Sequence, residues 1–68
     1  MQILTLRDEY ITLGQLLKAA GLVESGSEAK VRIQDGEVKV NGETETRRGR
    51  KLYSGDVAAF AGEEVKVE

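Results

Sequence analysis

The stretch VKVNGETETRRGRKLYSGD, residues 38–56, decides the fold of this chain. Its first residues alternate apolar and polar side chains, which is typical of a strand with one buried face. Asn41-Gly42 follows, and this dipeptide favours a β-hairpin turn because both residues tolerate a positive φ. We therefore predict two antiparallel strands around Asn41-Gly42.

The register of this hairpin determines which side chains face the core. A two-residue loop places Glu43 and Glu45 opposite the two valines, on the core face. A three-residue or bulged loop places Thr44 and Thr46 there instead. A shift of one residue turns every side chain of a strand to the other face. We expect the three-residue loop, because it keeps the carboxylates out of the core.

The second half of the stretch is a basic cluster. Arg47, Arg48, Arg50 and Lys51 put four positive charges into five positions, in a chain whose 10 basic and 12 acidic residues give a net charge of −2. Concentrated positive charge favours polyanions such as RNA or DNA, and the planar guanidinium matches phosphate oxygens. We expect these side chains to contact phosphate. We also expect the arginines to be replaceable without unfolding, because they lie in a polar loop. The alternative is a solvated turn that happens to be basic.

Working outward, two short helices are predicted before the hairpin. Thr12 and Gln15 have the spacing of a capping box, and Gly21 supplies a left-handed stop. The apolar side chains of this first helix share one face: Leu13, Leu16, Leu17 and Ala20. Ser25 and Glu28 repeat the capping-box spacing, and the second helix runs to about residue 34, with Ala29 and Ile33 on its buried face.

Strands are predicted on both sides of this helix-turn-helix unit. Residues 2–7 form a short strand or extended arm, and residues 57–60 and 64–67 form two strands after a turn at residues 54–56. The order strand, two helices, strands indicates a small α+β domain, with two short helices packed on a small, mainly antiparallel sheet. We expect residues 1–68 to form a single domain.

Composition excludes several classes of function. The chain has 68 residues, no Cys and no His, so it forms no disulfide, no thiolate zinc site and no Ser-His-Asp or Cys-His catalytic site. Glu43 and Glu45 face one side of a strand, but so short a chain leaves no room for a deep pocket, and we expect no enzymatic activity and no cofactor. No apolar run approaches the roughly 20 residues of a membrane helix. We expect a cytoplasmic monomer that does not bind membranes.

Four elements that occur in order carry a family resemblance. They are Gln15-Leu16-Leu17-Lys18, Ser25 with Ala29-Lys30, Gly36-x-Val38-x-Val40-Asn41-Gly42, and Leu52-x-x-Gly55-Asp56. Together they resemble the S4 domain, an RNA-binding module named for a ribosomal protein. The chain is most similar to stand-alone bacterial S4-domain proteins, some of which are associated with ribosomes. The resemblance covers roughly residues 11–60.

The resemblance implies an αL-type fold that presents the second helix and the adjoining hairpin to structured RNA. Lys30 matches a common basic position of the family. Many S4 domains carry Arg directly after the serine of the second helix, whereas this chain has Gly26. A glycine there could let a phosphate approach the backbone N–H groups at the helix start.

The candidate RNA-binding residues share exposure or positive charge. They are Ser27, Lys30, Lys39, Arg47, Arg48, Arg50 and Lys51. Ser27 is a candidate because capping does not need a second hydroxyl. Each of the two lysines also has an explanation that does not involve RNA. Lys30 can be a lysine at the edge of the apolar helix face, and Lys39 can be an ordinary exposed strand lysine. Tyr53 could stack on a base, although we favour a position in the core or at its edge.

We therefore expect non-catalytic binding of structured RNA, either ribosomal RNA or a ribosomal particle. The first alternative is a protein-interaction adaptor whose basic cluster meets an acidic partner. The second is a DNA-binding helix-turn-helix protein. Against the second, the predicted second helix has few basic residues, and the chain's positive charge is concentrated after the hairpin.

Overall fold

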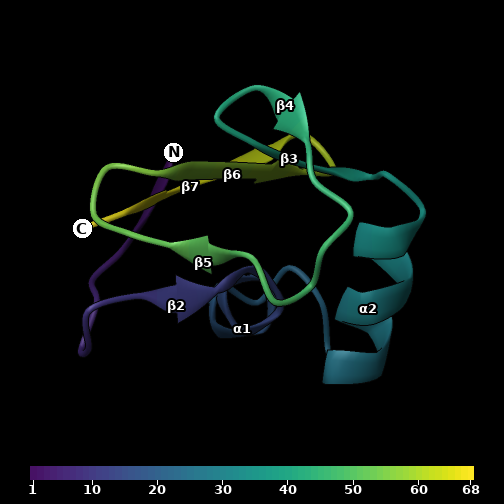
Figure 1. Cartoon of the computed structure of the whole chain (residues 1–68), viewed down its shortest axis with the longest axis horizontal. Helices are drawn as coiled ribbons and strands as arrows, with labels where there is room; N and C mark the ends of the chain where they lie inside the picture. Colours follow the sequence, from purple (N-terminus) through teal and green to yellow (C-terminus); the bar gives the residue numbers. More distant parts are fainter.

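The computed structural model describes residues 1–68 as two layers (Figure 1). The upper layer in this view is a five-stranded sheet, whose strands in spatial order are β1 (Gln2–Leu4), β7 (Glu63–Val67), β6 (Val57–Phe60), β3 (Val38–Val40) and β4 (Glu43–Thr44). The lower layer holds a two-stranded ribbon of β2 (Ile11–Thr12) and β5 (Lys51–Leu52) beside helix α1 (Leu13–Ala19). Helix α2 (Gly26–Gln34) stands at one end.

The sheet is mainly antiparallel, and the prediction of a small α+β fold is confirmed. Only β1 and β7 pair in parallel, with Gln2 opposite Val65. The other pairs of both sheets are antiparallel. The chain thus returns its last strand to lie beside its first.

Both helices begin where capping residues predict them. Thr12 and Gln15 form the complete capping box of α1, and Gly21 has the positive φ, 75°, expected after its end. Ser25 caps α2 by accepting a hydrogen bond from the Glu28 N–H. The second half of that capping box is absent, because the Glu28 carboxylate accepts from the N–H of Glu24 instead.

The core lies between the sheet and the helices. It consists of twelve apolar residues contributed by both layers: Leu13, Leu16, Leu17, Val23, Ala29, Ile33, Val38, Val40, Leu52, Ala58, Val65 and Val67. The leucines predicted on the inner face of α1 are fully buried, while Ala20 is partly buried and packs against this cluster.

The predicted three-residue hairpin loop is wrong. Asn41 and Gly42 both have positive φ, 52° and 86°, as in a two-residue type I′ turn, and Val40 pairs with Glu43. Glu43 is exposed at the end of the short edge strand β4, so it needs no buried partner. Glu45 is buried, but two arginines accompany it. This register therefore leaves no carboxylate buried without a partner, which was the reason for expecting the longer loop.

The β2–β5 ribbon was not predicted from the sequence, and it positions the basic cluster. The basic loop, residues 45–50, leaves β4 in the upper layer and enters β5 in the lower one (Figure 1). Because β5 pairs with β2, which leads directly into α1, the basic loop is brought to the N-terminus of α1.

Candidate nucleic-acid interface

Glu45 holds the basic loop together from inside. The residue is only 7% exposed. The Arg47 guanidinium donates two hydrogen bonds to its carboxylate, from Nε to Oε2 at 2.9 Å and from Nη2 to Oε1 at 3.0 Å. Arg50 Nη1 donates to Oε1 at 2.7 Å, and the Arg47 backbone N–H donates to Oε2. Glu45 therefore fixes two of the four cations of the cluster.

These contacts keep Glu45 ionised. Hydrogen bonds from the Arg47 side chain, and then from Arg50, lower the pKa of Glu45 to about 2, against the opposing effect of burial. The expectation that the arginines lie in a polar loop without a structural role does not hold for Arg47 and Arg50. Of the four cations of the cluster, only Arg48 and Lys51 form no ion pair.

The main chain of the basic loop covers the N-terminus of α1. The N–H of Leu13 donates to the carbonyl of Arg50 at 2.8 Å, and the N–H of Gly14 donates to the carbonyl of Arg48 at 3.0 Å. A Cβ on Gly14 would lie 2.7 Å from Cγ of Arg48. Glycine at this position allows the Arg48 side chain to lie across the first turn of α1.

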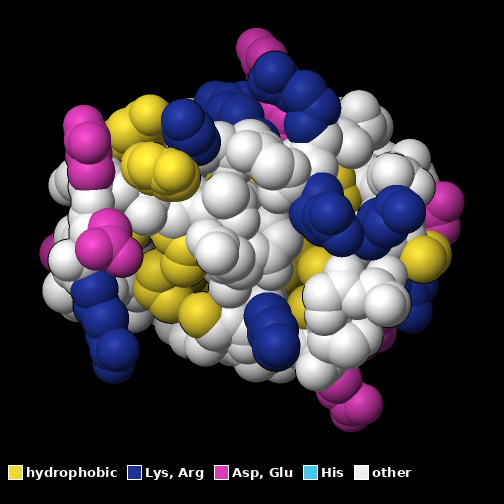
Figure 2. Space-filling model, turned by 60° about the horizontal axis from the view of Figure 1, so that its bottom comes forward, with side chains coloured by type: hydrophobic (Ala, Val, Ile, Leu, Met, Phe, Trp, Pro, Cys, Tyr) yellow, Lys and Arg dark blue, Asp and Glu magenta, His cyan; other side chains and the backbone are white.

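Two adjoining hollows carry much of the positive charge. One is lined by Arg47, Gly49, Arg50 and Lys51, and the other by Thr12, Gly14, Gln15, Lys18, Gly26, Arg48 and Gly49. They share Gly49, and neither is lined by an acidic or hydrophobic residue. Figure 2 shows Lys and Arg side chains across this side of the molecule, with acidic side chains mostly toward the rim of the view.

The N-terminus of α2 opens into the second hollow. Gly26 lines it together with Lys18 and Arg48, and no atom lies within 4 Å of where a Gly26 Cβ would be. The N–H groups of Gly26 and Ser27 make no hydrogen bond with the backbone. Lys30 is exposed one helical turn further along. The geometry thus places two helix N–H groups without an acceptor, those of Gly26 and Ser27, between cations from α1 and the basic loop.

The structure brings together most, but not all, of the residues predicted from the sequence. The four cations of the cluster line the two hollows, and Ser27 and Lys30 are exposed on the helix beside them. Lys39 is exposed on β3 between two buried valines. Since those valines face the core, Lys39 lies on the outer face of the sheet, away from α1 and the ribbon.

Sequence reasoning missed Lys18, Gly14 and Glu45 as parts of this site. Lys18 was part of the family pattern, but nothing in the local sequence places it beside Arg48. The isolated glycine in the first turn of a helix was a usable signal, because Gly inside a helix is unfavourable unless something packs against it.

Two exposed tyrosines lie at the other end of the cluster. Tyr10 and Tyr53 are 37% and 45% exposed, so Tyr53 is not in the core or at its edge, where we favoured placing it. Their ring centroids are 5.9 Å apart with the planes at 51°, and Lys51 Nζ lies 4.8 Å from the centre of the Tyr10 ring. The basic cluster is thus continuous with an aromatic pair.

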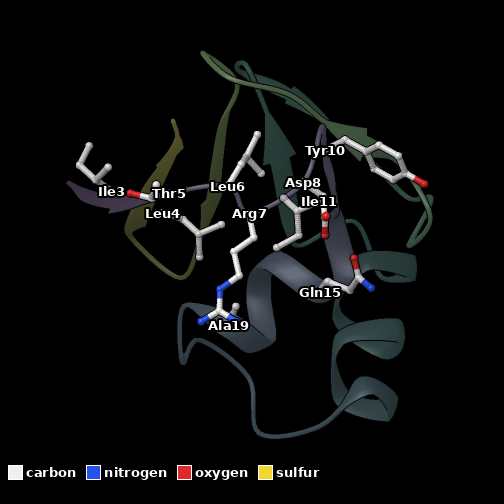
Figure 3. Close-up of a pocket in the computed structure, with 10 residues that line it drawn as sticks. All are labelled: Ile3, Leu4, Thr5, Leu6, Arg7, Asp8, Tyr10, Ile11, Gln15 and Ala19. Atoms are coloured by element: carbon white, nitrogen blue, oxygen red, sulfur yellow. The ribbon is translucent and has the colours of Figure 1, made fainter.

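A third hollow, of about 560 Å³, lies along the N-terminal segment and has a mixed lining of apolar, polar and charged residues (Figure 3). Leu4, Leu6 and Ile11 are among its lining residues, and Arg7 extends across it toward Ala19. None of the cations of the cluster lines it. The structure contains no helix long and apolar enough to span a membrane, and no group of three or more residues arranged to hold a metal ion.

Two known proteins of similar sequence and length carry names that refer to ribosome maturation and to RNA binding. The chain is 54% identical over 54 residues to "Probable ribosome maturation protein RlbA" of Bacillus subtilis (strain 168), covering 79% of this chain and 76% of that one. It is 45% identical over 58 residues to "Putative RNA-binding protein YbcJ" of Escherichia coli (strain K12), covering 85% and 83%. A Burkholderia lata tyrosine–tRNA ligase is 43% identical over 58 residues, but these are only 14% of that enzyme.

A solved structure and a family model agree with these relatives. The solution structure of E. coli YbcJ, described as revealing an αL motif involved in RNA binding, matches with a TM-score of 0.74 and 41% identity, covering 98% of this chain and 86% of that one. The family model described as "S4 domain" matches residues 4–68. The chain therefore belongs to the S4 domain family.

Proposed function

We propose that this protein binds structured RNA through the two basic hollows and the adjoining start of α2, without catalysing a reaction. One observation carries the proposal: Lys18, Arg47, Arg48, Arg50 and Lys51 line adjoining hollows that no acidic residue enters, although the chain is net acidic. Such a surface attracts phosphates, and the negative charge of the rest of the chain disfavours RNA binding at other surfaces.

The chemistry of the two hollows suggests different parts in binding. In the second hollow, a phosphate would meet the N–H groups of Gly26 and Ser27 while Lys18 and Arg48 neutralise its charge. Ser27 and Lys30 would extend this contact along α2. In the first hollow, the remaining cations would bind the next phosphates along the backbone. Lys39 is left out, because it lies on the outer face of the sheet.

The names of the relatives favour ribosomal RNA or a ribosomal particle as the target. Proteins called a ribosome maturation protein and an RNA-binding protein cover most of this chain's length. Both hollows are shallow and lined by polar groups, which suits recognition of RNA shape and backbone more than base sequence. Crosslinking in cells with RNA sequencing, together with sucrose-gradient fractions, would identify the RNA and show whether the protein follows ribosomal subunits.

The deciding experiment measures RNA affinity as a function of salt. If about four phosphates are neutralised, the logarithm of affinity should fall with that of salt at a slope of about −3 to −4. Arg48→Glu should weaken binding at least about tenfold and flatten the slope. Lys39→Glu is the matched control, since it makes the same charge change on the outer face of the sheet, and it should leave affinity within about twofold.

Two results would reject the proposal. One is an affinity that does not depend on salt. The other is equal weakening by Arg48→Glu and Lys39→Glu, which would indicate a response to net charge and not to the hollows. Retention of an acidic protein partner with no retention of RNA would support the adaptor alternative.

A further inference from the structure

The two tyrosines occupy matching positions on the outer face of the β2–β5 ribbon. Ile11 pairs with Leu52, so Tyr10 and Tyr53 are the next residues facing each other along the ribbon. Leu52 is fully buried and Ile11 packs against the core. Because side chains alternate along a strand, the tyrosines share the outer face with Lys51.

This arrangement keeps both rings in place, and Tyr53 is the more accessible of the two. Tyr10 lies between Lys51, 4.8 Å from its ring centre, and Tyr53, whose centroid is 5.9 Å away. Tyr53 is the more exposed ring, at 45%. Its backbone is held at the strand end, since the Tyr53 N–H donates to Asp56 Oδ2 at 2.8 Å and the Asp56 N–H donates to the Tyr53 carbonyl.

Lys51 connects the aromatic pair to the phosphate-binding surface. The same side chain lines the first basic hollow and lies over the Tyr10 ring. Tyr10 lines the edge of the third hollow, and Figure 3 shows its ring extending outward from the other lining residues. Figure 2 shows side chains of the hydrophobic class, which includes Tyr, exposed next to Lys and Arg on one face of the molecule. A flat aromatic surface beside backbone-binding cations is the combination that binds unpaired nucleotides.

We infer that Tyr53, supported by Tyr10 and Lys51, stacks on an unpaired base of the bound RNA. The inference rests on the proposed function and makes it more specific: the target is a junction between a duplex and a single-stranded segment. The duplex phosphates occupy the basic hollows, and the first unpaired base beyond them lies on the Tyr53 ring. A merely structural role, as a cross-strand pair that stabilises the ribbon, is the competing explanation.

The test compares a synthetic RNA hairpin that carries a short adenosine overhang with the same hairpin lacking it. The wild type should prefer the overhang. Tyr53→Leu keeps an apolar side chain but no stacking ring, and it should weaken binding to the overhang hairpin by about fivefold or more. Its affinity for the plain hairpin should stay within about twofold. Tyr53→Phe keeps the ring and should retain the preference.

Fluorescence gives a direct second readout, because the chain has two Tyr and no Trp. In Tyr10→Phe, all tyrosine emission comes from Tyr53, and the overhang hairpin should quench it more than the plain hairpin does. Equal affinity of wild type and Tyr53→Leu for the overhang hairpin, or equal quenching by both RNAs, would overturn the inference and leave a structural pair. If the wild type binds neither hairpin, both the proposed function and the stacking site are rejected.

Discussion

The N-termini of the two helices differ in what covers them. At α1, the N–H groups of Leu13 and Gly14 donate to carbonyls of the basic loop. At α2, the N–H groups of Gly26 and Ser27 have no backbone acceptor, and Gly26 faces open space in the second hollow. Both ends carry the same partial positive charge from the helix dipole. One end is used within the fold, and the other is available to an anion.

This difference explains how the basic loop is held in one conformation while the charge of Arg48 stays unpaired. The carbonyls of the loop satisfy α1, and Glu45 draws Arg47 and Arg50 inward. Arg48 is left beside Lys18 and the open start of α2. The covered helix end is therefore the support that positions cations around the uncovered one. Breaking that support should lower both stability and RNA affinity, whereas a negative charge added at the open end should lower RNA affinity without lowering stability.

Removing Glu45 should have the largest effect. Glu45→Ala deletes the acceptor of four hydrogen bonds. A hydrogen bond to a charged group contributes about 1.5–3 kcal/mol to stability. Since the freed arginines can reach water, we expect a net loss of about 1–3 kcal/mol, or roughly 4–8 °C in Tm per kcal/mol. RNA affinity should fall as well, despite the gain of net positive charge.

Glu43→Ala is the matched control for this variant. Glu43 lies two residues before Glu45, on the edge strand β4, is exposed, and forms no ion pair. Its removal should change stability by less than about 0.5 kcal/mol and should leave RNA affinity equal or slightly higher. Equal melting temperatures for the two variants would contradict a structural role of Glu45.

The same contacts predict how stability depends on pH. Glu45 has a pKa of about 2 in the folded protein, below the ordinary value of 4.5. A lowered folded pKa stabilises the fold above about pH 4.5, and this stabilisation is lost as the pH falls toward about 2. The wild type should exceed Glu45→Gln in stability at neutral pH, and urea titrations should show the difference narrowing over that acid range. A stability difference between wild type and Glu45→Gln that stays constant down to pH 2 would contradict this pH dependence.

Arg50 and Arg48 provide a comparison inside the loop itself. Arg50 donates to Glu45 at 2.7 Å with a side chain 34% exposed, whereas Arg48 forms no ion pair. Arg50→Ala should cost about 1 kcal/mol of stability, and Arg48→Ala less than about 0.5 kcal/mol. Both remove one charge from the hollows, so thermal melts should separate them while the salt dependence of RNA binding changes similarly. Melts that coincide would mean that Arg47 alone satisfies Glu45.

Local sequence signals were sufficient for the helices and the hairpin turn. The caps at Thr12 and Ser25, the spacing of the leucines in α1, and Asn41-Gly42 act over a few residues, and each predicted its element correctly. The hairpin register failed for a different reason. A carboxylate on the core face looked too costly because its partners, Arg47 and Arg50, were assigned to the ligand and not to the fold.

The candidate site was predicted only in part, because its residues meet through tertiary structure. The basic cluster is visible as a run of sequence, and it does line the hollows. Lys18 joins it only because β5 pairs with the short strand before α1, and strands of two residues leave almost no sequence pattern. The exposure of Tyr53 has the same origin, since Leu52 takes the buried position of the ribbon.

The smallest expected effect concerns the open end, and it isolates that end from the rest of the fold. Gly26→Glu places a negative charge where a phosphate would meet the helix start, and nothing lies within 4 Å of the new Cβ. An acid in the first turn suits the helix dipole, worth about 0.3–1 kcal/mol, so Tm should stay equal or rise slightly. RNA affinity should fall by about threefold or more.

Gly26→Ala separates the effect of charge from that of the glycine. Alanine favours the helix by up to about 1 kcal/mol over glycine, fits the same open space, and brings no charge, so it should raise Tm and leave RNA affinity nearly unchanged. Titration of both variants with ribosomal RNA, alongside melts, tests this. If Gly26→Glu binds as tightly as Gly26→Ala, the open helix end takes no part in binding. RNA would then contact the basic loop alone, and the two helix ends would differ in structure but not in function.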